Sequence, residues 1–450
     1  MPNRSVLLLI ADDWSELAKC YGNDVVSTPN IDGVARQGVV FDQAFCTTPS
    51  CAASRANLLT GLYSHQHGQY GHSHGIHGFR THEKLATRTL PAVLKQAGVF
   101  TGLVGKDHIA PKWVYPFDVD QRYQPWSVES LREGARSFFE QAGKRPFYLQ
   151  VASMYPHRTG GNFNRDQCGE ELKAGDVVYD PAKVVVPDWL PDVPEVRADL
   201  AAYHTFVSRY DRFVGAVLRE LERSGRADDT MVIVMTDHGM PFPGAKASMY
   251  DSGHHCPLIV HRPGDAPGRN RALVNWCDIF PTVCDWLGVP ADQMPQLPGR
   301  SLLPIIDQPD PAGWDRTFFS HTFHEVTNYY PYRVVRGRRF KLVRNLAHGL
   351  PLPLATDLFD SATWQAVRRN GLERMGKRLT ERVLHHAPEE FYDLENDPVE
   401  TTNVIDDPAF AAEVRAMRSA LEDFRLRTGD PWLELDYQAG KYGKRPANDQ

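Results

Sequence analysis

Short, uninterrupted apolar runs alternate with helix-like segments along the larger N-terminal part of the chain, and this alternation restricts the fold more than any other feature. The runs cover residues 6–11, 100–104, 147–152, 231–235 and 258–261. Such runs are typical of strands that are buried on both faces of a sheet. Helical patterns that end at glycine cover residues 28–37, 54–60, 90–96 and 198–224. Since glycine is a common helix stop, the pattern predicts an α/β fold whose mostly parallel sheet is flanked by helices.

The texture changes after about residue 311, where short strands and polar helices replace the apolar runs. The expected elements are two strands around Gly337 within residues 332–343, a helix over 362–384, a strand at 390–394 and a helix over 408–427. We therefore predict a larger domain over residues 1–310 and a smaller C-terminal α+β domain over residues 311–450, which carries an antiparallel sheet.

The composition excludes several classes of protein. Apolar residues make up 42% and charged residues 24% of the 450 residues, which is typical of a globular protein rather than of a disordered or coiled-coil chain. The net charge of −6 argues against a nucleic-acid partner, and the apolar run at residues 6–11 is too short to cross a membrane. The seven cysteines form no Cys-x-x-Cys pair, so neither a disulfide scaffold nor a zinc ribbon is expected.

The sequence begins directly with an expected strand, without the charged and apolar regions of a signal peptide. We therefore expect a cytoplasmic protein as the sequence stands, and a periplasmic one only if a signal has been removed. The oligomeric state stays open, with a homodimer as one option.

Acidic residues follow two of the expected strands. Asp12 and Asp13 come after the first strand, and Asp237 with His238 comes after the strand at 231–235. The carboxyl ends of parallel strands form the edge where ligands bind, and adjacent acids repel one another unless a cation lies between them. Aspartate and histidine both ligate divalent metals, so a metal site is one interpretation. A solvated or helix-capping acid pair and an Asp-x-Gly turn are the alternatives.

Cys51 lies just before an expected helix, and Arg55 follows it. A thiol at a helix N-terminus is electrostatically activated, and an arginine one turn further can hold an anion there. The alternative is an unreactive buried cysteine, which is the most common state of a free cysteine.

Basic and titratable side chains follow other strands. Lys106 and His108 come after one expected strand, His157 comes after another, and Lys246 follows the second acidic motif. A lone histidine is more often structural than catalytic, so each signal is weak alone. Further histidines are His254, His255 and a tract at positions 65, 67, 72, 74 and 77. The glycine- and tyrosine-rich texture of the tract favours a packed loop, with a metal-binding tract as the alternative.

Together these motifs resemble the type I sulfatases of the alkaline phosphatase superfamily. The matching segments are Asp12-Asp13, Cys51-Ala52-Ala53-Ser54-Arg55 with Leu58-Leu59-Thr60-Gly61, Gly105-Lys106-x-His108, Pro156-His157, Thr236-Asp237-His238-Gly239 and the stretch at 391–398. The likeness covers nearly the whole chain and implies a sulfatase catalytic domain over residues 1–310. Runs such as Gly239-Met240-Pro241-Phe242-Pro243 and His324-Glu325-Val326-Thr327 are most similar to the N-sulfoglucosamine sulfohydrolase (sulfamidase, heparan N-sulfatase) subgroup.

The resemblance implies that Cys51 is oxidised to Cα-formylglycine by a formylglycine-generating maturase. The hydrated aldehyde is a gem-diol, of which one hydroxyl attacks sulfur and the other expels sulfate as the aldehyde re-forms. It also implies that Asp12, Asp13, Asp237 and His238, together with residue 51, bind a divalent cation, by family habit Ca²⁺, with Mg²⁺ or Mn²⁺ as alternatives.

The remaining catalytic roles also follow from the resemblance. Arg55 and Lys106 would support the modified residue and the bound anion, and Lys106, Lys246 and His157 would contact the sulfuryl oxygens. His108 would take the proton that lets the gem-diol collapse, and His157 would protonate the leaving group; these two roles are exchangeable.

The implied substrate is a sulfated amino sugar or glycosaminoglycan fragment, namely a terminal N-sulfated glucosamine of heparan or heparin, with His324 and Glu325 in its pocket. A basic stretch within residues 333–344 either favours an anionic sugar or is a solvated strand face. An O-sulfatase or a phosphonate monoester hydrolase on the same scaffold is the alternative enzyme. A non-catalytic protein that binds sulfated sugars is the alternative from another class.

Two positions depart from the family pattern. Ala53 stands where the usual signature has proline, which implies that a different maturase acts on Cys51. His238 stands where the sulfamidase subgroup often has asparagine, although many other sulfatases have histidine there.

Overall fold

The large sheet of the computed structural model has eight strands, and its topology confirms the predicted α/β class. The structure describes residues 4–74, 77–121, 124–163 and 175–434. In order across the sheet, the strands are β5 (Val119–Gln121), β4 (Phe100–Gly105), β6 (Phe147–Ala152), β1 (Ser5–Ala11), β7 (Thr230–Thr236), β8 (Leu258–His261), β2 (Val39–Phe41) and β9 (Gly268–Asn270). Neighbouring strands are parallel, except that β8 runs antiparallel to both β7 and β2.

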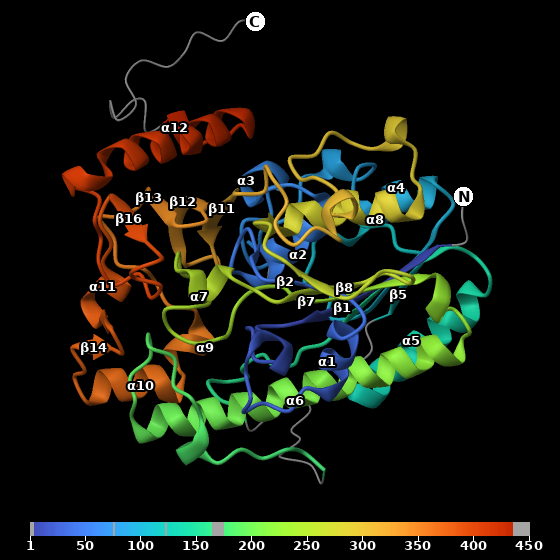
Figure 1. The fold of residues 1–450 in the computed structure, drawn as a ribbon, viewed down its shortest axis with the longest axis horizontal. Coiled ribbons are helices and arrows are strands. Elements are labelled where there is room, and N and C mark those ends of the chain that lie inside the picture. The colour runs from blue at the N-terminus through green and yellow to red at the C-terminus, as the bar shows by residue number, and fades with distance from the viewer. Residues whose placement is uncertain (1–3, 75–76, 122–123, 164–174, 435–450) are drawn as a thin grey trace, which may run out of the picture.

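Helices cover both faces of this sheet, as Figure 1 shows. One face carries α1 (Pro29–Ala35), α5 (Val128–Ala142) and α6 (Pro194–Arg223), and the other carries α2 (Cys51–Thr60), α4 (Leu90–Gln96) and α8 (Ile279–Leu287). The side chains of β1 enter the two cores alternately, Leu7 and Leu9 into the first and Val6 and Leu8 into the second. Burial on both faces explains why this strand is continuously apolar. Among the described helices, none combines the length and apolar character that a membrane crossing demands.

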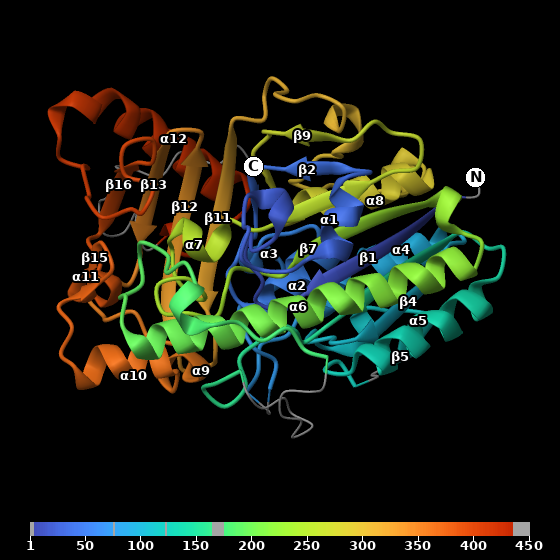
Figure 2. The same cartoon turned by 60° about the horizontal axis from the view of Figure 1, so that its bottom comes forward.

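A second, antiparallel sheet stands beside the first (Figure 2). Its strands are β11 (Arg316–Phe323), β12 (Tyr329–Gly337), β13 (Phe340–Asn345) and β16 (Glu389–Asp393), and α12 (Ala411–Arg427) packs on it. The sequence analysis predicted β12, β13, β16 and α12, but it missed β11. Phe45 and Met249 from the larger part pack into the core of this sheet, so the two parts share a core and, within the described residues, no clear gap marks a boundary. The domain boundary at residue 310 therefore stays a prediction. Residues 435–450 of the predicted second domain lie outside the described residues.

The predicted helix over residues 362–384 is wrong. That segment contains α10 (Ala362–Arg369), a hairpin of β14 (Arg374–Met375) and β15 (Arg378–Leu379), and the short α11 (Thr380–Leu384). Gly371 and Gly376 interrupt it with φ angles of 58° and 56°, a left-handed conformation that a continuous α-helix does not contain.

The basic stretch on β12 and β13 is ion-paired throughout, with Arg338 and Arg339 solvated at its turn and the other cations buried. Its ion pairs are Arg333–Asp430, Arg336–Asp251, Arg338–Asp310, Arg339–Asp393, Lys341–Asp251, Lys341–Glu400 and Arg344–Glu389. The side chains of Arg333 and Lys341 have no exposed surface at all. The buried cations therefore hold the C-terminal part together, and the interpretation that the stretch favours an anionic sugar stays a prediction.

Lys341→Met is expected to lower the free energy of unfolding by about 3 kcal/mol, because the buried Glu400 carboxylate loses its nearest cation, while Asp251 keeps its pair with Arg336. The Lys341 Nζ lies 2.8 Å from Asp251 Oδ1 and 2.6 Å from Glu400 Oε1. Urea denaturation measures the loss. The matched control is Arg338→Ala, whose pair with Asp310 is exposed and is worth at most about 1 kcal/mol. Equal losses in the two variants would contradict the structural role of Lys341.

Candidate active site

The acidic motifs meet at the carboxyl edge of the large sheet because β1 and β7 are parallel neighbours. Ala11 pairs in register with Thr236, so the residues that follow these two strands emerge side by side. The Asp13 N–H donates to Asp237 Oδ1 over 3.1 Å, and the Asp13 backbone is left-handed with a φ of 67°. Asp12, Asp13 and Asp237 are fully buried, and their carboxylates are close enough to share one ion.

Cys51 is the first residue of α2, which starts at this residue rather than at residue 54 as predicted. Its Sγ lies 3.2 Å from His238 Nε2. Arg55 follows one turn later on the same helix face, and its Nε donates to Asp237 Oδ2 over 3.0 Å. The Cys51-x-x-x-Arg55 spacing therefore places both side chains against the acidic cluster.

Two lysines reach the same cluster, Lys106 from the end of β4 and Lys246 from the loop between β7 and α7 (Asp251–His254). Lys106, at the end of β4, contacts Asp12. The Lys246 Nζ donates to Asp13 Oδ2 over 2.9 Å and to Asp357 Oδ2 over 2.9 Å. Burial alone would raise the pKa of Asp12, but the Lys106 ammonium lowers it. The acids thus face fixed positive charge from Lys106 and Lys246 as well as from Arg55 of α2.

His108 and His157 lie next to this cluster and differ in protonation. Burial and the neighbouring Lys106 lower the pKa of His108 to about 3, so it is neutral near pH 7. Burial and the neighbouring Lys246 act to lower the pKa of His157, but Asp13 and Asp12 outweigh them, and the pKa is raised. His157 Nε2 lies 3.9 Å from Asp13 Oδ2. His108 is therefore an unprotonated imidazole, whereas His157 retains a proton more firmly and can act as a donor.

The donor set fits a divalent cation. Burial and the neighbouring Asp12 raise the pKa of Asp237 to about 7, which shows how unfavourable these crowded carboxylates are without an ion between them. The Nδ1 of His238 lies 3.0 Å from the Gly239 carbonyl oxygen, so Nδ1 carries the hydrogen and Nε2 faces the cluster as a potential ligand. An oxygen-rich set with one imidazole suits Ca²⁺ or Mg²⁺ and also accepts Mn²⁺.

A cavity of about 650 Å³ opens above this cluster, and its lining includes Lys106, His108, His157 and Lys246. His324 and Glu325 also line it, as expected for substrate-pocket residues. His324 Nδ1 lies 3.0 Å from Ser50 Oγ, beside Cys51. Glu325 Oε2 accepts a hydrogen bond of 2.8 Å from the Thr356 hydroxyl. A cavity of this volume accommodates a small-molecule ligand.

Asp357 also belongs to this site, although no sequence pattern indicated it. This residue lies in α9 (Thr356–Phe359), and its carboxylate bonds Lys246 and faces the cavity from the C-terminal part of the chain. No motif precedes it, because α9 is a single short turn after a proline-containing loop. Only the packing of the two sheets brings Asp357 to Lys246, which is 111 positions away in the sequence.

The histidine tract divides into two groups, so the interpretation of a purely structural loop is partly wrong. His65 and His67 are buried, and His65 is held by Ser320 and Thr428. His72 and His74 instead line the catalytic cavity, where His74 Nε2 lies 3.1 Å from His108 Nε2.

The remaining histidine candidates lie outside the site. His77 is in an exposed turn. His254 stacks on Phe319 with ring centroids 4.1 Å apart, and His255 contacts Glu16 over 3.5 Å. His254 and His255 are therefore not part of the site.

The structure brings all the other predicted residues together. The cluster contains Asp12, Asp13, Cys51, Arg55, Lys106, His108, His157, Asp237, His238 and Lys246. Its carboxylates Asp12, Asp13 and Asp237 are matched by the cations Arg55, Lys106 and Lys246. A divalent ion would therefore leave net positive charge, which suits an anionic substrate.

Comparisons with known proteins point in one direction. A model of the sulfatase family matches residues 4–289, and a model of the N-sulphoglucosamine sulphohydrolase C-terminal region matches residues 242–352. The chain is 37% identical to human N-sulphoglucosamine sulphohydrolase over 96% of its own length and 91% of that protein.

Solved structures share the fold. A 2-O glycosaminoglycan sulfatase has a TM-score of 0.69 and 21% identity, with coverage of 98% of this chain and 95% of that one. A structure described as a complex with its substrate D-glucosamine-2-N,6-O-disulfate has a TM-score of 0.67 and 19% identity, with coverage of 95% and 98%. At these identities the likeness supports the architecture, and the choice of substrate depends on other observations.

Proposed function

Since the chain belongs to the sulfatase family, we propose that it hydrolyses the N–S bond of a terminal N-sulfated glucosamine in heparan or heparin fragments. It is a sulfatase, a hydrolase of sulfate esters or sulfamides. The observation that carries the choice of substrate is the 37% identity to human N-sulphoglucosamine sulphohydrolase across nearly both chains. The observation that carries the chemistry is a cysteine at a helix start, surrounded by acids, cations and the imidazoles of His108, His157 and His238.

Cys51 is the proposed nucleophile after a maturase has oxidised it to Cα-formylglycine. In the hydrated form, one hydroxyl oxygen bonds to sulfur and releases its proton as the S–N bond breaks. The leaving nitrogen takes a proton from His157, so the step neither gains nor loses protons overall. Transfer of a proton from the second hydroxyl to His108 then allows the aldehyde to re-form and the C–O bond to sulfate to break. His108 is neutral, so its ring has an unprotonated nitrogen to which this proton can be transferred.

The basic side chains bind and orient the sulfuryl group. Lys106 and Lys246 supply positive charge from two sides, and Arg55 holds Asp237 in place from α2. A divalent cation held by Asp12, Asp13, Asp237 and His238, with Ca²⁺ as the first choice and Mg²⁺ or Mn²⁺ as alternatives, would add charge that neutralises the sulfate oxygens. His324, Glu325 and Asp357 would contact the sugar from the cavity wall.

His157→Asn is expected to lower kcat on glucosamine N-sulfate by about 10²-fold or more, because an amine leaves poorly unless it is protonated. On 4-nitrophenyl sulfate the loss should be much smaller, since that phenolate leaves without a proton. The comparison variant is His108→Asn, for which the two substrates should suffer alike because this residue acts after the leaving group has departed. If His108→Asn shows the dependence on leaving group and His157→Asn does not, the two roles are reversed.

A substrate panel tests the proposed function. Purified, matured protein is assayed on glucosamine N-sulfate, glucosamine 6-O-sulfate and an aryl phosphonate monoester. We expect the highest kcat/KM on the N-sulfate. Faster turnover of the second compound would make the protein an O-sulfatase, and faster turnover of the third a phosphonate monoester hydrolase. Binding of the N-sulfated sugar without turnover of any of the three would favour a non-catalytic sugar-binding protein.

A further inference from the structure

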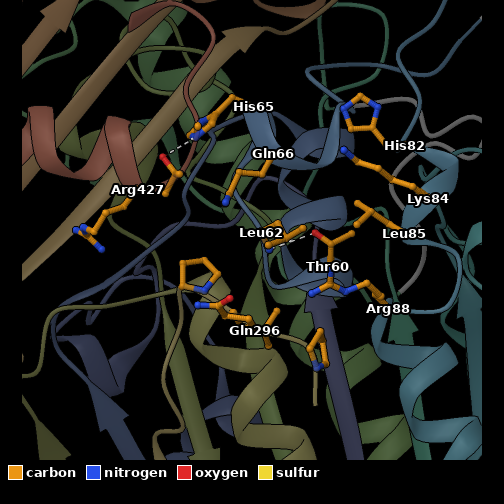
Figure 3. A pocket seen from close by; sticks show the side chains of 15 residues that line it. Thr60, Leu62, His65, Gln66, His82, Lys84, Leu85, Arg88, Gln296 and Arg427 are labelled. Atoms are coloured by element: carbon orange, nitrogen blue, oxygen red, sulfur yellow. Dashed lines mark hydrogen bonds between the residues drawn. The ribbon is translucent and has the colours of Figure 1, made fainter. Parts of the chain in front are cut away.

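A second cavity, of about 730 Å³, lies away from the catalytic one and shares no lining residue with it. Figure 3 shows it from close by. Its walls come from the end of α2, from α3 (Ser64–His67), from the segment around residues 82–88, from the loop at 295–298 and from the end of α12. Because α2 begins at Cys51 and is ten residues long, this groove lies about 14 Å along the helix from the nucleophile.

The charge of this groove is one-sided. Lys84, Arg88 and Arg427 line it, and none of its lining residues is acidic. Lys84 and Arg88 lie on one side and Arg427 on the opposite side (Figure 3). Within the described part of the chain, these three side chains form no ion pair, whereas each cation of the basic stretch on β12 and β13 has a carboxylate partner. In a protein of net charge −6, unpaired cations gathered in one groove point to an anionic ligand.

The two histidines of the groove add little positive charge. His65 is already hydrogen-bonded through both ring nitrogens, to Ser320 Oγ over 2.7 Å and to Thr428 Oγ1 over 2.9 Å. Burial and the neighbouring Lys84 lower the pKa of His82, which keeps it neutral near pH 7. Recognition of an anion therefore depends on Lys84, Arg88 and Arg427.

The rest of the lining selects the class of anion. Gln66 and Gln296 present amide groups, and Leu62, Leu85 and Leu297 present apolar surface. The Gln66 Oε1 accepts from the Tyr63 N–H, so its amide nitrogen remains available as a donor. A single inorganic ion would fill a small part of this volume. No phenylalanine, tyrosine or tryptophan lines the groove, so the aromatic stacking surface typical of single-stranded nucleic acid sites is absent from these described walls.

We propose that this groove is a second, non-catalytic binding site for an anionic saccharide that carries sulfate or carboxylate groups, held by Lys84, Arg88 and Arg427. The saccharide class rests on the proposed function, whereas the preference for an anion rests on the groove itself. The site would retain another segment of the same polysaccharide, or a second polysaccharide chain, while the catalytic cavity holds the terminal sugar.

The test compares two triple variants of equal charge change. Lys84→Ala/Arg88→Ala/Arg427→Ala removes the groove cations, and Arg36→Ala/Lys144→Ala/Lys183→Ala removes exposed cations outside both cavities. Binding of a sulfated heparin-derived oligosaccharide and of an unsulfated oligouronate is measured by calorimetry in the full-length Cys51→Ala protein, with glucosamine N-sulfate in excess to fill the catalytic cavity. We expect the groove variant to lose at least about tenfold in affinity for one or both probes, and the control variant to bind as the parent does.

In the matured enzyme, the groove variant should keep kcat/KM on the monosaccharide within about twofold. Unchanged oligosaccharide affinity, an equal loss in the control variant, or binding of inorganic sulfate only would overturn the proposal. Groove-dependent oligosaccharide binding in a protein that fails to cleave the N-sulfated sugar would sink the proposed function and leave the second site standing.

Discussion

Cys51→Ala is expected to lower turnover by about 10⁴-fold or more while leaving the fold intact, because it removes the only group that can become the gem-diol. The substitution deletes one buried sulfur atom at the start of α2, so the loss of unfolding free energy should stay near 1–2 kcal/mol. Cys51→Ser should be almost as inactive, since a serine hydroxyl cannot release sulfate by re-forming an aldehyde. Steady-state kinetics and thermal denaturation measure the two effects.

Cys46→Ala is the matched control, because Cys46 is also fully buried and its Sγ also lies near a histidine ring nitrogen, 3.8 Å from His254 Nδ1. It should lose a similar amount of stability and keep its activity. Mass spectrometry of the peptide that contains residue 51 gives the independent readout. Conversion to formylglycine lowers its mass by about 18 Da, the difference between CH₂SH and CHO. An intact thiol in an active preparation would refute the proposed nucleophile and leave the family membership untouched.

Asp237→Asn should reduce activity about 10³-fold at limiting divalent cation, because a lost ligand costs several kcal/mol of transition-state stabilisation. The Asp237 carboxylate accepts from Arg55 Nε through Oδ2 and from the N–H groups of Asp13 and His238 through Oδ1. Asparagine keeps the shape and one acceptor oxygen but removes the charge. Part of the activity should therefore return at high Ca²⁺, with the half-activating concentration raised at least about tenfold.

Calorimetric titration of the protein with Ca²⁺ measures the same loss without relying on turnover. The matched control is Asp430→Asn. Asp430 is another buried carboxylate that is paired with arginines, namely Arg333 and Arg425, and it does not belong to the cluster. The substitution should lower stability and leave the Ca²⁺ dependence unchanged. If Asp237→Asn binds Ca²⁺ as tightly as the parent, Asp237 is not a ligand.

The local pattern of apolar residues was sufficient to predict the central strands of the large sheet. Continuous apolar runs located β1, β4, β6, β7 and β8 within a residue or so, because a strand buried on both faces admits almost no polar side chain. The same reasoning located the acids after β1 and β7, since ligand-binding residues follow the carboxyl ends of parallel strands. The expected helix placed Cys51 just before its first turn with Arg55 following, and the structure shows that both belong to α2 and share one face.

The sequence alone therefore determined five central strands of the large sheet and the residue types that carry the chemistry, because each of these depends on neighbours within a few positions. It did not locate the short strands β2, β5 and β9, the strand β11 or the exact starts of α2 and α6. The tertiary structure alone decided which distant groups meet. It brought Asp357 to Lys246, turned His72 and His74 toward His108, and matched Lys341 with Asp251 and Glu400. Such pairings depend on how two sheets pack, and charged side chains that are far apart in sequence carry no local signal of their partners.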